Sequence, residues 1–109
     1  MEYIEIDKNM IPYKFDMTLE GETYTFQVNY NVLKDFFTID LLKNDEVIVL
    51  GEKLIYGKPL FLSSRYKDIP KVNIVPLDLT GRAERITFDN LNEEVFLFLI
   101  DGDKDEILD

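Results

Sequence analysis

Paired carboxylates are the residues of this chain best suited to chemistry. Asp101 and Asp103 lie close together in the sequence, as do Glu93 and Glu94. Glycoside hydrolysis uses two carboxylates that flank a sugar bond, one of them with a pKa raised by burial. These pairs fall in a charged tail or beside the end of an expected strand, where carboxylates are normally solvated. We therefore interpret them as surface groups without a catalytic role.

Two short motifs approach known ligand-binding loops but do not match them. Residues 101–106 carry carboxylates at alternating positions, as in a calcium loop, yet Glu106 stands where that loop needs glycine. Residues 51–58 have five residues between two glycines where a phosphate-binding loop has four, and Pro59 replaces its Ser or Thr. Loose binding of a divalent cation by the clustered carboxylates stays open. We expect no cofactor.

The chain contains no histidine and no cysteine. It therefore lacks the usual general base, the usual zinc ligands, a thiol nucleophile and any disulfide. No apolar run is long enough to span a membrane, and the first residues are acidic where a signal peptide would be basic. We expect a cytosolic protein that is not an enzyme and that acts by binding or assembly.

Charge is distributed unevenly along the chain. The formal net charge is −10, which disfavours nucleic acid and anionic membranes as partners. Residues 53–85 nevertheless carry seven basic against three acidic groups. One interpretation is that these cations pair with acidic neighbours on a solvated surface. The other is a docking face for an acidic partner, including a second copy of the chain.

Two aromatic residues in the same stretch strengthen the docking hypothesis. Phe61 and Tyr66 are the aromatic residues least accounted for by the expected strands, and aromatic and arginine side chains are enriched at protein interfaces. The predicted interface consists of basic and aromatic residues: Lys53, Lys58, Phe61, Arg65, Tyr66, Lys67, Lys71, Arg82 and Arg85.

Two β-hairpins are predicted in the first half of the chain. From Tyr13 to Leu19 every second residue is apolar, which is the period of a strand with one buried face. The alternation returns over residues 24–30, after a glycine-containing turn. A second hairpin is expected from residues 36–42 and 47–50, separated by turn-forming residues. Because residues 47–50 are all apolar, we expect either a strand covered on both faces or a segment that contributes to the core.

The second half of the chain is predicted to hold shorter elements. Gly57 and Pro59 lead us to expect a short strand between bends over residues 52–62, followed by a loop to residue 70. A strand over residues 72–75 should end, or lie at a sheet edge, at Pro76. Its successors are a turn over residues 78–81, a helical turn over 87–92 capped by Thr87, and a last strand over 93–100.

Together these elements predict an all-β fold, a small antiparallel β-sandwich or partly open barrel with at most one short helical turn. Residues 1–100 are expected to form a single domain, because the chain is too short for two cores. Residues 101–109 form an acidic C-terminal tail that we expect to fray through its own charge repulsion.

Several of these segments also resemble a known family. They are similar to small phage and prophage proteins related to the plug in the baseplate of a contractile-tailed cyanophage, and the likeness runs from about Tyr3 to Ile100. The segments are residues 11–13, 19–26, 37–41, 50–54, 57–61 and 74–78. The resemblance implies a structural part at the tip of the tail tube that contacts hub, tube or other baseplate proteins and closes the lumen until infection. It also implies a place in the virion tail baseplate after assembly in the bacterial host cytoplasm, and it brings no catalytic residues.

An alternative from another class remains open. A small β-barrel with exposed aromatic side chains is a common scaffold for binding a sugar or another small molecule. The virion assembly protein is our first hypothesis, and this ligand-binding module is the second.

Overall fold

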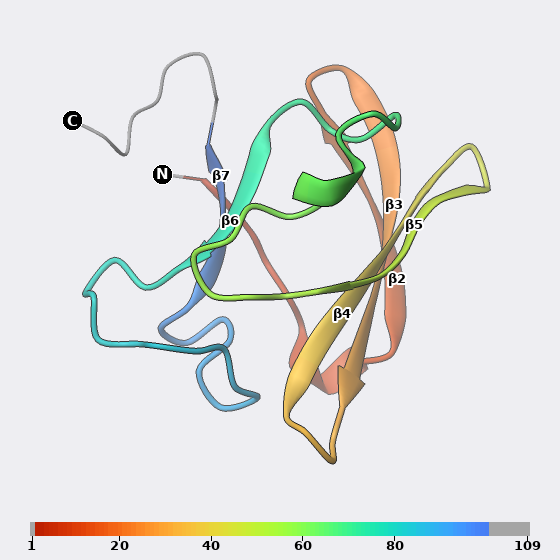
Figure 1. The fold of residues 1–109 in the computed structure, drawn as a ribbon. Helices are drawn as coiled ribbons and strands as arrows, with labels where there is room; N and C mark the ends of the chain where they lie inside the picture. Colours follow the sequence, from red (N-terminus) through yellow and green to blue (C-terminus); the bar gives the residue numbers. More distant parts are fainter. Residues whose placement is uncertain (1, 101–109) are drawn as a thin grey trace.

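The computed structural model describes residues 2–100 and shows two antiparallel β-sheets that face one another as layers (Figure 1). The sheets are not closed into a barrel, so the predicted all-β sandwich is confirmed. One sheet has four strands in the order β2 (Tyr13–Leu19), β3 (Glu22–Asn31), β4 (Phe36–Lys43) and β5 (Glu46–Lys53). The other has the order β1 (Tyr3–Ile4), β7 (Phe96–Ile100) and β6 (Asn73–Leu77). In the described part of the chain, the helical elements are the 3-10 turns η1 (Lys8–Met10) and η2 (Leu62–Ser64).

The β2–β3 hairpin follows directly from the alternating sequence. Phe15 is paired with Phe26 and Met17 with Tyr24, so the apolar side chains of both strands share the inner face. The turn places Glu20 and Gly21 at φ values of 52° and 80°, and two consecutive positive φ values suit the right-handed twist of a two-residue hairpin. This predicted hairpin is confirmed, as is the β4–β5 hairpin.

The expectation that β5 is covered on both faces is wrong. Val49 is buried, but Val47 is 52% exposed and Leu50 is 69% exposed. The physical reason is position, because β5 is an edge strand whose pairing with β4 shifts register near Leu41. At this irregularity the backbone N–H of Gly51, with φ of 68°, donates to Asp40 Oδ1 at 2.7 Å.

The short strand expected over residues 52–62 is also absent from the structure. After β5 ends at Lys53, the chain instead forms an irregular connection that crosses from one sheet to the other (Figure 1). Its backbone amides bond to both layers: Leu54 N–H donates to Phe37 of β4, and Leu60 N–H donates to Ile74 of β6. Because this connection bonds to both sheets in turn, it does not form the regular hydrogen-bond ladder of a strand.

The three-stranded sheet contains both a confirmed and a missed element. β6 lies at an edge, as Pro76 indicates, and its other side is approached by Gly57 N–H, which donates to the Pro76 carbonyl at 2.8 Å. The sequence did not predict β1, in which Tyr3 is paired with Phe98 and Ile4 with Leu97. The helical turn expected over residues 87–92 is not a helical element in the structure, which has a turn there in which Thr87 Oγ1 accepts the Asn90 N–H at 3.1 Å.

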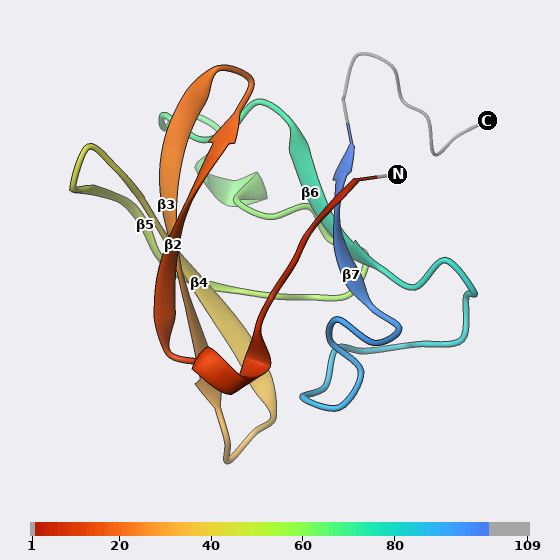
Figure 2. The ribbon, with the colours of Figure 1, turned by 180° about the vertical axis from the view of Figure 1, so that it is seen from behind.

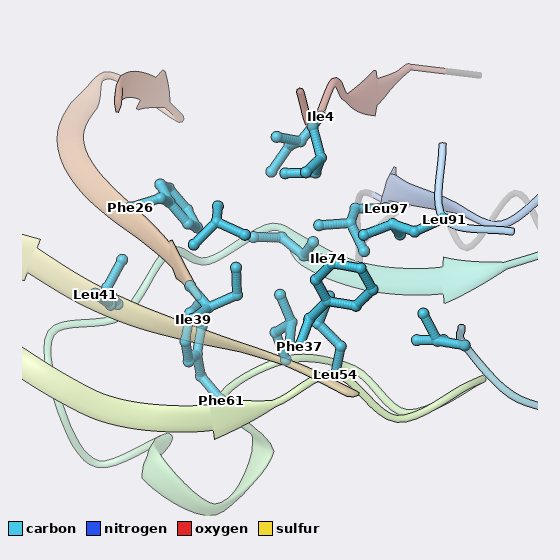
Figure 3. Close-up of a cluster of buried hydrophobic side chains, with 14 of the residues drawn as sticks. Ile4, Phe26, Phe37, Ile39, Leu41, Leu54, Phe61, Ile74, Leu91 and Leu97 are labelled. Carbon is cyan, nitrogen blue, oxygen red and sulfur yellow. The ribbon is translucent and has the colours of Figure 1, made fainter. Parts of the chain in front are cut away.

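One hydrophobic core fills the space between the layers (Figure 3). Phe26, Phe37 and Ile39 contribute from the four-stranded sheet, and Ile74 and Leu97 from the three-stranded sheet. The N-terminal segment crosses between the layers from β1 to η1, which is seen most clearly from behind (Figure 2). The core therefore depends on both sheets and on the connections that cross between them.

Candidate functional site

Four of the predicted interface residues come together in the segment that follows η2. Arg65, Lys67 and Lys71 line a hollow of about 350 Å³, and Tyr66 stands beside it with 82% of its surface exposed. The rest of the lining is mainly apolar: Leu60, Ile69, Pro70 and Val72, with Asp68 and Asn73. We call this hollow the basic groove. It brings exposed cationic side chains together with partly buried apolar ones, as a protein contact often does.

Contacts with three strands position the basic groove. Lys67 Nζ donates to the carbonyl of Ile48 in β5 at 3.1 Å. Asp68 accepts a hydrogen bond from Lys43 Nζ at 2.9 Å, and the same ammonium pairs with Glu22 of β3. These two carboxylates raise the pKa of Lys43, with the hydrogen bond to Glu22 as the largest cause. The ion triad joins the groove segment to one end of the four-stranded sheet.

Phe61 does not belong to a surface site, and its place in the predicted interface is wrong. Only 1% of it is exposed, and its ring centroid lies 6.4 Å from that of Phe26 in the core (Figure 3). Its backbone has a left-handed φ of 63°, and its N–H donates to Glu52 Oε2 at 2.9 Å. A non-glycine residue with positive φ cannot be read from sequence, and here it accompanies a side chain buried between the sheets.

The remaining basic residues lie apart from the basic groove. Lys53 and Arg85 line a second hollow of about 280 Å³, together with Lys34. Lys53 Nζ lies 4.6 Å from the ring centroid of Phe36, while Arg85 Nη2 donates to the Asp35 carbonyl at 3.0 Å. Lys58 and Arg82 line neither hollow. The positive stretch seen in the sequence therefore does not form one continuous lining.

Asp35 is a key structural carboxylate that the sequence did not indicate. Its Oδ1 accepts the Tyr30 hydroxyl at 2.6 Å and the Phe88 N–H at 2.8 Å. The hydrogen bond from Tyr30, followed by that from Phe88, lowers the pKa of Asp35. The same bond raises the pKa of Tyr30 to about 12. Asp35 thus fastens the β3–β4 turn to the segment that precedes β7.

The sequence also did not predict an exposed apolar patch in the turn between β3 and β4. Val32 and Leu33, in the β3–β4 turn, are 75% and 92% exposed. Val32 also lines a hollow of about 510 Å³ together with Ile11, Pro12, Tyr30 and Phe88. Both ribbon views place the β3–β4 turn and η1 at the same end of the molecule (Figures 1 and 2). We call Val32 and Leu33 the apolar tip. The sequence feature that could have revealed this patch is the presence of two aliphatic residues in a turn, where polar residues are normally favoured.

A further hollow, beside η1, is open and mostly polar. It has a volume of about 880 Å³, and four acidic residues, Glu5, Asp7, Asp89 and Glu93, share its lining with Lys8. Lys8 Nζ donates to the Phe88 carbonyl at 2.7 Å. Across residues 2–100, no group of three or more His, Cys, Asp or Glu side chains is arranged to hold a metal ion. The calcium-like motif of residues 101–106 lies outside the described residues.

No helix in the described residues is both long and apolar enough to cross a membrane.

None of the curated proteins compared with the chain matches it. A family model does match: that of the cyanophage baseplate Pam3 plug gp18, over residues 1–103. The match spans nearly the whole chain, including every strand of both sheets. The chain therefore belongs to the family of cyanophage baseplate plug proteins, structural components of a phage tail baseplate.

Proposed function

We propose that this chain closes the tip of a phage tail tube through contacts with hub, tube or other baseplate proteins, and that it catalyses no reaction. The family match over residues 1–103 carries this proposal. In this proposal the chain is made in the cytoplasm of the bacterial host and joins the baseplate during tail assembly.

The apolar tip is the contact surface best suited to this role. Leu33 is almost fully exposed, and an exposed pair of large aliphatic side chains gains free energy when a partner covers it. The neighbouring hollow, lined by Ile11, Tyr30 and Phe88, offers a partner side chain an apolar recess. A projecting tip beside a recess is suited to fixing the orientation of a rigid structural part.

The test is binding to the tail-hub protein from the same phage or prophage. Purified full-length chain is mixed with the hub protein, and the complex is followed by size-exclusion chromatography and titration calorimetry. The double variant Val32→Asp, Leu33→Asp should bind at least about tenfold more weakly, because each buried interface anchor contributes about 1 kcal/mol or more.

Leu79→Asp is the matched control for the binding test. Leu79 is also an aliphatic turn residue and is 66% exposed, but it does not line the recess beside the apolar tip. It should bind like the unchanged chain. Failure of the unchanged chain to bind hub, tube and baseplate proteins would contradict the proposed function. Equal loss of binding in both variants would contradict the choice of surface.

A ligand-binding module is the second candidate. The hollow beside the apolar tip has a volume of about 510 Å³, within the size range of small-molecule pockets, and Tyr30 and Phe88 provide aromatic surface. A thermal-shift screen with monosaccharides and oligosaccharides tests it, since a specific ligand raises the melting temperature by mass action. We expect no shift, and a saturable shift with one sugar would favour this candidate.

A further inference from the structure

β2 presents a long strand edge that the described residues leave uncovered. The other sheet edges are short or partly covered: β1 has two residues, the Ile48 carbonyl of β5 accepts a hydrogen bond from Lys67 Nζ, and the Pro76 carbonyl of β6 accepts one from Gly57 N–H. Among residues 2–100, no backbone-to-backbone hydrogen bond joins β2 to a segment other than β3. Such an edge offers backbone donors and acceptors to another strand.

The turn after β2 decides which of its backbone groups face outward. This turn has two residues, both with positive φ, so Leu19 and Glu22 flank it as a hydrogen-bonded pair. Hydrogen-bonded and non-hydrogen-bonded pairs alternate along an antiparallel ladder. The backbone groups of Lys14, Asp16 and Thr18 therefore point away from β3, toward the free side of the sheet.

The side chains along this edge form an apolar set and a charged set. Tyr13, Phe15 and Met17 pack against the core but are only partly buried. Lys14 and Asp16 are exposed on the opposite face and carry opposite charges two positions apart. An antiparallel strand that covers this edge must match both sets.

Charge selects one register for pairing β2 with β2 of a second copy. The ladder forms only where outward-facing backbone groups lie opposite one another. In a register centred on Phe15, Lys14 of each copy lies opposite Asp16 of the other. Centring on Lys14 or on Asp16 places like charges opposite one another, which is destabilising, and centring on Met17 gives neither charge an opposite partner. The edge is therefore complementary to itself in one register.

The same register also matches the apolar set. Phe15 meets Phe15 of the second copy in a non-hydrogen-bonded pair, where cross-strand side chains are closest, and Tyr13 lies opposite Met17. The Phe15 ring already stacks on Phe26, with centroids 5.5 Å apart and 9° between the planes. Contact between the two Phe15 rings would extend this aromatic row and cover the partly buried side of the strand.

We propose that two copies of the chain form a symmetric dimer through the free edge of β2, antiparallel and centred on Phe15. The two four-stranded sheets then join as one continuous sheet, and Lys14 and Asp16 form reciprocal pairs on its outer face. Because the contact is two-fold symmetric, it closes on itself and association stops at the dimer. This inference does not depend on the proposed function, since it concerns a contact between copies.

Amide hydrogen exchange measured by NMR on the full-length chain tests the edge. The amides of Lys14 and Asp16 should exchange more slowly as the protein concentration rises toward about 1 mM, because carbonyls of the second copy accept them. The amides of Phe15 and Met17, which bond to β3, should be protected at every concentration. Exchange at Lys14 and Asp16 that does not change with concentration would overturn the proposal, as would a monomer at about 1 mM in analytical ultracentrifugation.

Charge-reversal variants test the register. Lys14→Glu and Asp16→Lys each place like charges opposite one another, so each variant alone should dimerise at least about tenfold more weakly. An equimolar mixture of the two should restore association, because the acidic edge of one variant then pairs with the basic edge of the other. A mixture that associates no better than its components would overturn the proposal.

Lys71→Glu is the matched control for Lys14→Glu. It changes the net charge by the same amount at an exposed position outside the four-stranded sheet, so it should dimerise like the unchanged chain. If Lys71→Glu weakens the dimer as much as Lys14→Glu does, the effect comes from net charge, and the β2 contact is wrong.

Discussion

The Tyr30 hydroxyl lies 2.6 Å from Oδ1 of Asp35, and this same oxygen accepts the backbone N–H of Phe88 at 2.8 Å. One carboxylate thereby connects β3, the β3–β4 turn and a segment 53 positions later. Arg85 reinforces the connection by donating to the Asp35 carbonyl. The wall of the recess beside the apolar tip, formed in part by Tyr30 and Phe88, depends on this linkage.

Tyr30→Phe should lower the free energy of unfolding at neutral pH and lower it less in acid. The pKa of Asp35 is lowered from its ordinary 3.8, mainly by the Tyr30 hydrogen bond, so the folded state binds fewer protons than the unfolded state. That stabilisation is present above pH 3.8 and is lost as the pH falls through the folded pKa. Urea unfolding at pH 7 and pH 3 measures the difference. In Tyr66→Phe, whose ring is exposed, the two pH values should show no such difference from the unchanged chain.

Asp78→Asn should loosen the turn over residues 78–83. Asp78 is buried, and its two oxygens accept bonds from the backbone N–H groups of Thr80, Arg82 and Ala83 and from the Thr80 hydroxyl. The Thr80 hydroxyl is the main cause that lowers the pKa of Asp78. An amide nitrogen cannot accept, so the backbone N–H groups on one side of the new side chain, either that of Thr80 or those of Arg82 and Ala83, lose their acceptor. Faster hydrogen exchange at these amides is expected; unchanged rates would refute the structural role of the carboxylate.

Lys43→Met should increase the rate at which a protease cleaves the segment that lines the basic groove, residues 65–73. The variant removes the ammonium that joins Glu22 to Asp68, so the end of the sandwich loses its ion triad. Arg65, Lys67 and Lys71 are potential trypsin sites in this segment. Limited digestion followed by mass spectrometry should find faster cleavage after these residues than in the unchanged chain. Lys14→Met, which removes an exposed lysine of β2, serves as the control and should digest at the original rate at these sites.

Phe61→Ala and Tyr66→Ala should have opposite consequences, although the two residues are close in sequence. Phe61 is buried, so its truncation should cost about 3–5 kcal/mol of unfolding free energy through lost packing and a residual cavity. Tyr66 is exposed, and its truncation should change stability by no more than about 0.5 kcal/mol. Chemical denaturation of both variants gives the comparison. Similar losses in the two would mean that the segment after η2 is packed differently.

Local patterns predicted the hairpins, and non-local contacts account for what they missed. In β2 and β3, alternation decides which side chains face inward, and each strand pairs with its neighbour along the chain. β1 has only two residues, too few for a period, and it forms because β7 lies beside it. The register shift that leaves Leu50 exposed depends on the pairing of β5 with β4, which an apolar run cannot reveal.

The candidate site also has features that follow from local sequence and features that depend on non-local contacts. Arg65, Tyr66, Lys67 and Lys71 are near one another in sequence, so their grouping was predictable, and their role at an interface stays a prediction. Lys53 and Arg85 meet at another hollow because the connection after β5 crosses between the sheets. The burial of Phe61 depends on a left-handed backbone conformation, for which its sequence carries no signal.

Localisation in the intact particle tests the central claim most directly. Purified phage or induced prophage particles are labelled with gold-conjugated antibody against the full-length chain and viewed by electron microscopy, after mild treatment that opens the baseplate. The account predicts gold at the baseplate end of the tail tube, and loss of that label in particles from a deletion strain. Particles that contain none of the chain, or that carry it only on the head, would contradict the account.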